Sequence, residues 1–202
     1  MKEILLLEDK MARIDNIMPG GKAALDAIGR LDLLPDIQTE AAPHTFDKAL
    51  AAYQLVIIHT SWLKERGLYN TLTDYMRVHG EKRFILFSGG THQNQVINSG
   101  QGLIIGSETL YRQELPAFLE HYQAGDAQSL LKFLYGEQWR LSLLLQLQQI
   151  RWKAALSTKR DDEGEPTEDT IQEDKILGVL QMESITDEQL SQMIDEELKR
   201  AE

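Results

Sequence analysis

Four consecutive apolar residues at positions 55–58 (Leu-Val-Ile-Ile) constrain the fold of this chain more than any other stretch. Polar residues bound them on both sides, and a short run of this kind predicts a strand that is buried on both faces. Such strands occur in parallel sheets covered by helices, where ligands bind beyond the carboxyl ends of the strands. His59 and Thr60 occupy that position, so this stretch predicts both the central strand and the place of a site.

Strand and helix patterns alternate along residues 1–124. Apolar runs predict strands at residues 3–7, 83–87 and 103–105, and a weaker pattern after Pro35 predicts another at 36–40. Helical spacing of apolar residues fills the intervals, and Pro19 with the two glycines that follow it interrupts the first helix. The sequence therefore predicts an α/β fold with a doubly wound, five-stranded parallel sheet in residues 1–124.

The region after residue 124 is expected to form three parts. Residues 125–159 form a helical extension, 160–172 an acidic flexible linker, and 173–202 an acidic helical tail. The helix expected at 139–156 is apolar around much of its circumference, so another surface has to cover it. Either it packs within its own domain, or it forms an interface with a partner or a second copy. The candidate interface residues are Leu143, Leu144, Leu147, Ile150, Trp152, Leu190, Met193 and Ile194.

The net charge of −11 lies almost entirely in the C-terminal part of the chain. Residues 160–202 hold four basic and fifteen acidic residues, whereas residues 1–159 hold seventeen of each. This balance argues against binding to nucleic acid or to an anionic membrane surface, because both need a basic face. We expect the partner to be a protein, or a second copy of this chain.

The absence of cysteine and of long apolar runs bears on the compartment. Without cysteine, neither disulfides nor thiolate metal sites can form, as is usual in a reducing compartment. No apolar run approaches the roughly 20 residues that span a bilayer, and the run at 4–7 is too short for a signal peptide. These features predict a cytoplasmic protein.

The order of motifs resembles the receiver domain of two-component response regulators over residues 1–124, which has a flavodoxin-like fold. Residues 4–9 (Ile-Leu-Leu-Leu-Glu-Asp) match the first strand and the acidic pair after it. Residues 55–58 match the third strand, and residues 84–88 (Phe-Ile-Leu-Phe-Ser) match the fourth with its hydroxyl. The resemblance implies a pocket formed by Glu8, Asp9, His59, Thr60, Ser88 and Ser107.

Two chemical positions of that family are changed in this sequence. His59 stands where the family has its phosphate-accepting aspartate, and Ser107 or Glu108 stands where it has a lysine. Phosphoryl transfer to an aspartate needs that carboxylate, a magnesium ion and the lysine. The resemblance therefore implies a degenerate domain, a pseudo-receiver, that acts as a regulatory or adaptor protein through contacts of its helical extension and tail. We expect no cofactor.

Two enzymatic alternatives use the same pocket. Glu8, Asp9, His59 and His92 combine carboxylates with imidazoles, which suit a transition metal such as zinc, manganese or iron. Alternatively, His59 or Ser88 serves as nucleophile or base in a hydrolase, although no G-x-S-x-G motif surrounds Ser88. Whether the protein is an enzyme stays open at this point.

His59 has a further expected property in the non-catalytic interpretation. Its imidazole is expected to pair with Glu8 or Asp9 in place of a metal ion. A neighbouring carboxylate stabilises the protonated ring, so the pKa of His59 is expected to lie above the unperturbed value of about 6.5.

Overall fold

The computed structural model describes residues 2–34, 43–91, 94–97, 100–156 and 168–201. The chain divides into two compact units, residues 1–97 with 101–130 and residues 98–100 with 131–202. We call them the sheet unit and the helical unit, and describe each by itself. The sheet unit continues to residue 130, past the expected domain end at residue 124. Helix α8 (Ser129–Tyr135) contains the point of division.

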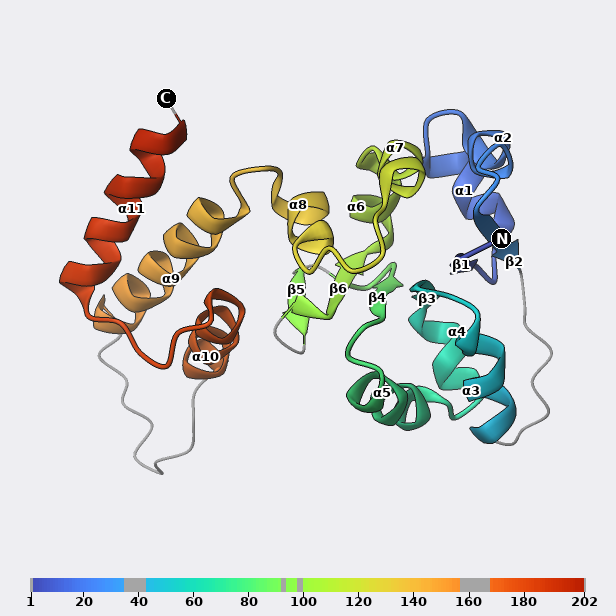
Figure 1. Cartoon of the computed structure of the whole chain (residues 1–202), viewed down its shortest axis with the longest axis horizontal. Coiled ribbons are helices and arrows are strands. Elements are labelled where there is room, and N and C mark those ends of the chain that lie inside the picture. Colours follow the sequence, from blue (N-terminus) through green and yellow to red (C-terminus); the bar gives the residue numbers. More distant parts are fainter. Residues whose placement is uncertain (1, 35–42, 92–93, 98–99, 157–167, 202) are drawn as a thin grey trace. The chain divides into compact units, whose positions relative to one another are not determined.

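The sheet unit is built on a six-stranded sheet (Figure 1). Its strands are β1 (Ile4–Leu7), β2 (Leu31–Leu34), β3 (Leu55–His59), β4 (Arg83–Ser88), β5 (Gln95–Ile97) and β6 (Gly102–Gly106). They lie in the order β2-β1-β3-β4-β6-β5; β5 pairs with β6 antiparallel and the other neighbouring pairs are parallel. The prediction of an α/β fold with a mainly parallel sheet is confirmed, and the strand order is compatible with a flavodoxin-like fold.

The predicted number of strands was wrong, and one predicted strand lies outside the described residues. The sheet has six strands rather than five, because the short β5 adds an antiparallel edge next to β6. The second strand is β2, which precedes Pro35, whereas the sequence predicted residues 36–40; those residues lie outside the described part of the chain. Residues 31–34 form this strand because their apolar side chains lie in parallel register with those of β1, with Leu33 paired to Leu6.

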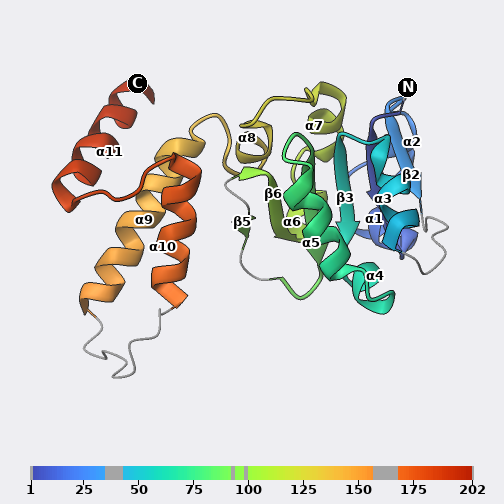
Figure 2. The same ribbon diagram turned by 60° about the horizontal axis from the view of Figure 1, so that its bottom comes forward.

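Helices cover both faces of the sheet (Figures 1 and 2). One face packs against α3 (Pro43–Ala51), α4 (Thr60–Glu65) and α5 (Tyr69–Val78), in a core that includes Leu5, Val56 and Phe84. Alternate strand residues point to the opposite face. There Phe87 contacts Tyr111 of α6 (Ser107–Arg112), and α7 (Leu115–His121) adds further apolar residues.

The predicted interruption of the first helix is confirmed. It divides into α1 (Met11–Ile17) and α2 (Gly21–Asp26). Gly20 and Gly21, which follow Pro19, have φ angles of 79° and 57°, which side chains with a Cβ rarely adopt. The break therefore follows from the sequence at residues 19–21.

The helical unit contains α9 (Trp139–Leu156), α10 (Glu168–Leu180) and α11 (Asp187–Ala201), and both α10 and α11 pack against α9 (Figure 2). The side chain of Arg151 on α9 reaches Glu173 of α10 at 2.6 Å and Asp187 of α11 at 2.8 Å. Part of the expected linker, residues 168–172, is helical, because α10 begins at Glu168; residues 160–167 lie outside the described part. None of the described helices combines the length and apolar character needed to span a bilayer.

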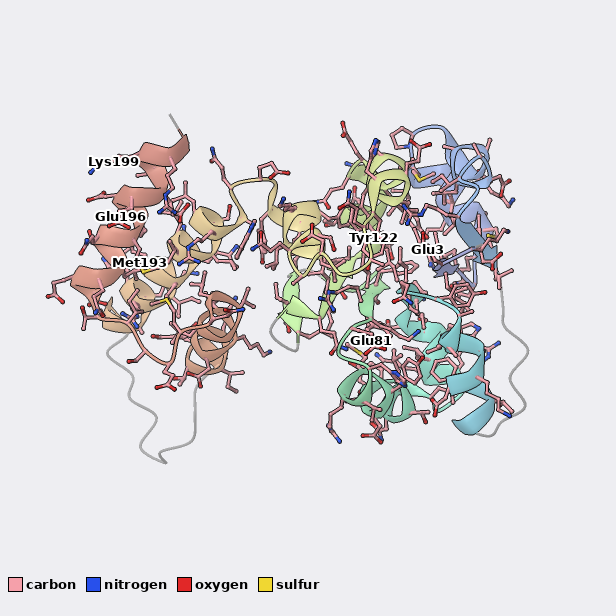
Figure 3. All side chains as sticks on the ribbon, in the orientation of Figure 1. Glu3, Glu81, Tyr122, Met193, Glu196 and Lys199 are labelled. Atoms are coloured by element: carbon pink, nitrogen blue, oxygen red, sulfur yellow. The ribbon has the colours of Figure 1, made fainter. Side chains whose placement is uncertain are left out.

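The candidate interface residues are placed mainly inside this unit. Those buried are Leu143, Leu144, Leu147, Ile150, Leu190 and Ile194. Met193, labelled in Figure 3, is half-buried, and Trp152 is 68% exposed. These side chains are thus buried where α10 and α11 pack against α9, which agrees with the alternative of packing within the chain. Trp152 alone of the eight candidates remains largely exposed.

Candidate functional site

The carboxyl edge of the parallel strands brings several predicted site residues to one end of the sheet unit. Glu8 and Asp9 follow β1, His59 ends β3, Ser88 ends β4, and Ser107 follows β6. Because β1, β3, β4 and β6 are neighbours in parallel register, their carboxyl ends lie at the same edge. The sequence therefore identified the correct edge, and the side-chain contacts decide its chemistry.

Glu8 is completely buried and accepts three hydrogen bonds. Its Oε1 accepts from the backbone N–H of Lys10 at 2.9 Å and from Nη1 of Arg13 at 2.5 Å. Its Oε2 accepts from the hydroxyl of Tyr111 at 2.8 Å. Burial and the neighbouring Asp9 raise the pKa of Glu8 overall, although the three donors act to lower it. The carboxylate is thus held by donors of the protein itself.

Arg13 lies beside both members of the acidic pair. Its Nη1 is 3.4 Å from Oδ1 of Asp9, in addition to its contact with Glu8. Burial acts to raise the pKa of Asp9, but the interaction with Glu8 and the positive charges around it, including Arg13, lower it overall. Arg13 thus supplies the positive charge that a divalent cation supplies in other acidic pockets of this kind.

His59 is buried at 3% exposure, and its ring is part of a helix cap. Its Nδ1 accepts the backbone N–H of Ser61 at 3.3 Å, at the start of α4. An N–H donor at Nδ1 identifies the neutral ring as the tautomer with its proton on Nε2. Nε2 is buried and has no hydrogen-bond partner among the described residues, and the ring packs edge-on against Phe87 at 5.0 Å.

The expected rise in the pKa of His59 was wrong. Its Nδ1 is 3.6 Å from Oδ1 of Asp9, so the predicted proximity to a carboxylate is present. Burial nevertheless lowers the pKa of His59, and the positive charges of Arg13 and Lys10 lower it further, against the opposing effect of Asp9. Arg13 already pairs with Glu8 and Asp9, and its positive charge disfavours a proton on the imidazole.

The hydroxyl residues of the predicted pocket form no hydrogen bond with Glu8, Asp9 or His59 in the described part of the chain. Thr60 begins α4 and is half-buried, and the Oγ of Ser88 accepts the backbone N–H of Gly90 at 3.3 Å. Ser107 is buried, and its Oγ has no hydrogen-bond partner in the described part of the chain. Glu108, the other candidate for the family's lysine position, pairs with Arg112 at 2.7 Å.

The proposed metal ligands do not form a metal-binding group in the described residues. No set of three or more histidine, aspartate or glutamate side chains there is arranged to hold an ion. The reason lies in Arg13, which takes up oxygens of Glu8 and Asp9, and in Nδ1 of His59, which accepts the N–H of Ser61. His92 lies outside the described residues.

Sequence reasoning missed Arg13 and Tyr111 as members of this site. Arg13 had a detectable signal, because it stands four residues after Asp9 at the start of a helix, a spacing that suits an ion pair. Tyr111 had no such signal. It lies 103 residues from Glu8 in sequence, and packing of α6 beside α1 brings it there.

We predict that Arg13→Gln destabilises the sheet unit by about 3 kcal/mol, because it leaves the buried charge of Glu8 without its cationic partner. The control is Arg112→Gln, which removes an exposed pair with Glu108 and should cost under about 0.5 kcal/mol. Urea unfolding at neutral pH measures both. Equal effects of the two substitutions would contradict the assigned role of Arg13.

His59 makes a separate prediction about pH. Since its folded pKa lies below the unfolded value of about 6.5, its contribution to stability is present above that value and is lost as pH falls through the folded pKa. As pH falls, the free energy of unfolding should decrease less steeply in His59→Gln than in the unchanged protein. The difference in slope is at most about 1.4 kcal/mol per pH unit. Urea unfolding between pH 7.5 and about pH 4.5 gives the comparison.

The control for His59→Gln is His121→Gln, which changes an exposed histidine on α7. It should keep the pH dependence of the unchanged protein. Parallel curves for the unchanged protein and His59→Gln would show that the imidazole does not titrate as inferred.

The described pocket thus combines two carboxylates already engaged by protein donors, a neutral buried imidazole and unconnected hydroxyls. The positive charge beside the two carboxylates is that of Arg13. No known protein family, no curated protein and no solved structure matches this chain.

Proposed function

We propose that this chain is a non-catalytic regulatory or adaptor protein built on a doubly wound pseudo-receiver domain. The observation that carries the proposal is the position of Arg13 between Glu8 and Asp9. A receiver domain uses such an acidic pair to hold the magnesium ion of phosphoryl transfer, as the resemblance in the sequence implies. Here the pair has a permanent cation that belongs to the chain.

The other reacting positions support the same proposal. Phosphoryl transfer to a side chain needs a nucleophile and positive charge on the transferred group's oxygens. His59 replaces the carboxylate nucleophile, and its Nδ1 is used to cap α4. Ser107 carries no charge, and Glu108 is negative and paired with Arg112. The fold is proposed to persist as a surface for protein contacts rather than as a catalyst.

A fixed pocket implies a domain held in one state. Removing one partner of a buried ion pair commonly costs about 3–5 kcal/mol, because the remaining charge stays unpaired in a medium of low polarity. Glu8 depends on Arg13 and on Tyr111 of α6 together. We infer that these contacts hold α1 and α6 in place, so that regulation acts through binding of a partner and not through phosphate.

The contact surface is proposed to lie around Trp152 in the helical unit. Trp152 is 68% exposed beside a groove of about 530 Å³, whose other lining residues include Gln148, Ala155, Asp187 and Leu190. An exposed tryptophan beside a concave surface is typical of interface anchors. Because residues 160–202 carry a net charge of −11, we propose a protein partner with a basic surface, acting in the cytoplasm.

The pocket generates a direct test. We predict that acetyl phosphate with Mg²⁺ leaves no acid-labile phosphoryl group on the protein, and that His59→Asp does not restore one, because the lysine is also missing and Arg13 remains. Intact mass spectrometry measures the adduct. A stoichiometric phosphoryl adduct on the unchanged protein would overturn the proposal and favour chemistry at Glu8, Asp9, His59 and Ser88.

The contact surface generates another prediction. Trp152→Ala should abolish recovery of basic partners from a native extract while changing the free energy of unfolding by less than about 0.5 kcal/mol, because the side chain is mostly exposed. The control is Val78→Ala, at another exposed apolar residue, which should keep the partners. Light scattering separates a second copy from a partner: a dimer that Trp152→Ala dissociates would replace the basic partner with self-association.

A further inference from the structure

The groove beside Trp152 lies at one end of a longer seam between two helices. Nη1 of Arg151 lies 2.8 Å from Oδ1 of Asp187, at the start of α11. Nε of Arg140, at the start of α9, lies 3.2 Å from Oε1 of Glu197, near the end of α11. The two helices therefore run antiparallel and pack side by side along this length (Figure 2). We call the line along which they pack the α9–α11 seam; it belongs entirely to the helical unit.

Exposed apolar side chains continue along this seam from the groove. On α9, Leu145 precedes Trp152 by seven residues, and both are exposed. On α11, the exposed Leu198 follows Asp187 by eleven residues. Because an α-helix has about 3.6 residues per turn, these intervals are close to two and three full turns. Since Trp152 and Asp187 line the groove, each leucine lies on the side of its helix that faces the groove, and the apolar side chains form one row along the seam.

Glu188 and Asp195 supply negative charge beside this row. Both are exposed and lie seven residues apart, on one side of α11. The arginine of the groove, Arg151, is shared by the carboxylates of Glu173 and Asp187. The groove therefore has no unbalanced positive charge that would repel a basic ligand.

The helical unit as a whole is acidic. Its residues 131–202 hold sixteen acidic and nine basic side chains. On α9, Arg140 pairs with α11 and Lys153 is exposed; on α11, Lys199 stands one turn after Glu196, and Figure 3 labels both. The charge around the seam thus favours a basic ligand.

A helix suits this seam better than an extended segment. The backbone N–H and C=O groups of α9 and α11 are used within the two helices, so the seam offers no row of backbone groups to an extended chain. A helix satisfies its own backbone, and it can place apolar side chains one and two turns apart into the groove between two other helices. The expected ligand is therefore an amphipathic helix.

We propose that the protein partner binds through a basic amphipathic helix that lies along the α9–α11 seam. The apolar side of this helix packs on Trp152, Leu145 and Leu198. Its lysine or arginine side chains lie beside Glu188 and Asp195. Eleven residues of α11 span about 16 Å, so a helix of about three to four turns covers the seam. The proposal rests on the function proposed above and identifies the element of the partner that is recognised.

The binding test uses the full chain and three fluorescent peptides. The first contains two copies of the heptad Leu-Lys-Lys-Leu-Leu-Lys-Lys, which places its leucines on one side of a helix. The second has the same composition in an order without an apolar side, and the third has glutamate at every lysine position. In fluorescence anisotropy the first should bind saturably, the second at least about tenfold more weakly, and the third not at all.

Substitutions in the apolar row test where the first peptide binds. Trp152→Ala and Leu198→Ala should each weaken its binding at least about fivefold, because each removes an apolar contact of the proposed interface. The control is Ile171→Ala on α10, because Ile171 is 44% exposed and Leu198 46%. It should leave binding unchanged. Leu145→Ala repeats the test if Leu198→Ala alters the helical signal in circular dichroism.

Paired substitutions test the contribution of charge. Glu188→Gln combined with Asp195→Asn should weaken binding of the first peptide and make it less sensitive to salt. Asp169→Asn combined with Asp174→Asn removes the same charge from α10 and should change binding less than about twofold, since distant exposed charges are screened. Equal effects of the two pairs, or equal binding of the first two peptides, would overturn the proposal.

Failure of this inference differs from failure of the proposed function. If Trp152→Ala loses partners from the extract but the first peptide does not bind, the helical ligand is wrong and the contact surface stands. If Trp152→Ala keeps those partners, both proposals lose their surface.

Discussion

The buried carboxylate of Glu8 is the constraint on which the carboxyl edge of the sheet depends. A charge with no exposed surface requires donors from the protein, and Glu8 obtains them from three directions. Lys10 supplies a backbone N–H, Arg13 an ion pair from α1, and Tyr111 a hydroxyl from α6. The Glu8 side chain, just after β1, therefore connects α1, which follows it directly in sequence, with α6, which is far away in sequence.

This network also determines the state of His59. Burial lowers the pKa of the imidazole, and the positive charge of Arg13 adds to this effect, so the neutral ring is favoured despite the nearby Asp9. A neutral ring can accept the N–H of Ser61 and begin α4. Thus His59 serves as the N-cap of α4. The charges of the pocket are balanced by Arg13.

Buried polar groups at the carboxyl and amino ends of the strands differ in how they are hydrogen-bonded. At the carboxyl edge, Glu8 is satisfied by residues of the chain. At the amino edge, Lys82 is likewise satisfied, by three carbonyls, whereas the hydroxyl of Tyr75 and Oδ1 of Asp47 are buried with no hydrogen-bond partner among the described residues.

The sequence by itself determined the features that depend on neighbouring residues. The apolar run at 55–58 predicted the central parallel strand, and Pro19 with its glycines predicted the break between α1 and α2. The sequence also placed Glu8, Asp9 and His59 at one edge, because parallel strands end together.

Only the tertiary structure decided the features that depend on residues distant in the chain. Tyr111 reaches Glu8 across 103 positions, and three carbonyls near the end of α3 accept from Lys82, about 30 positions later. Whether the apolar circumference of α9 was covered within the chain was equally undecided, because periodicity gives the apolar face of a helix but not its neighbour. Local pattern fixes which side chains an element presents, and packing fixes what they contact.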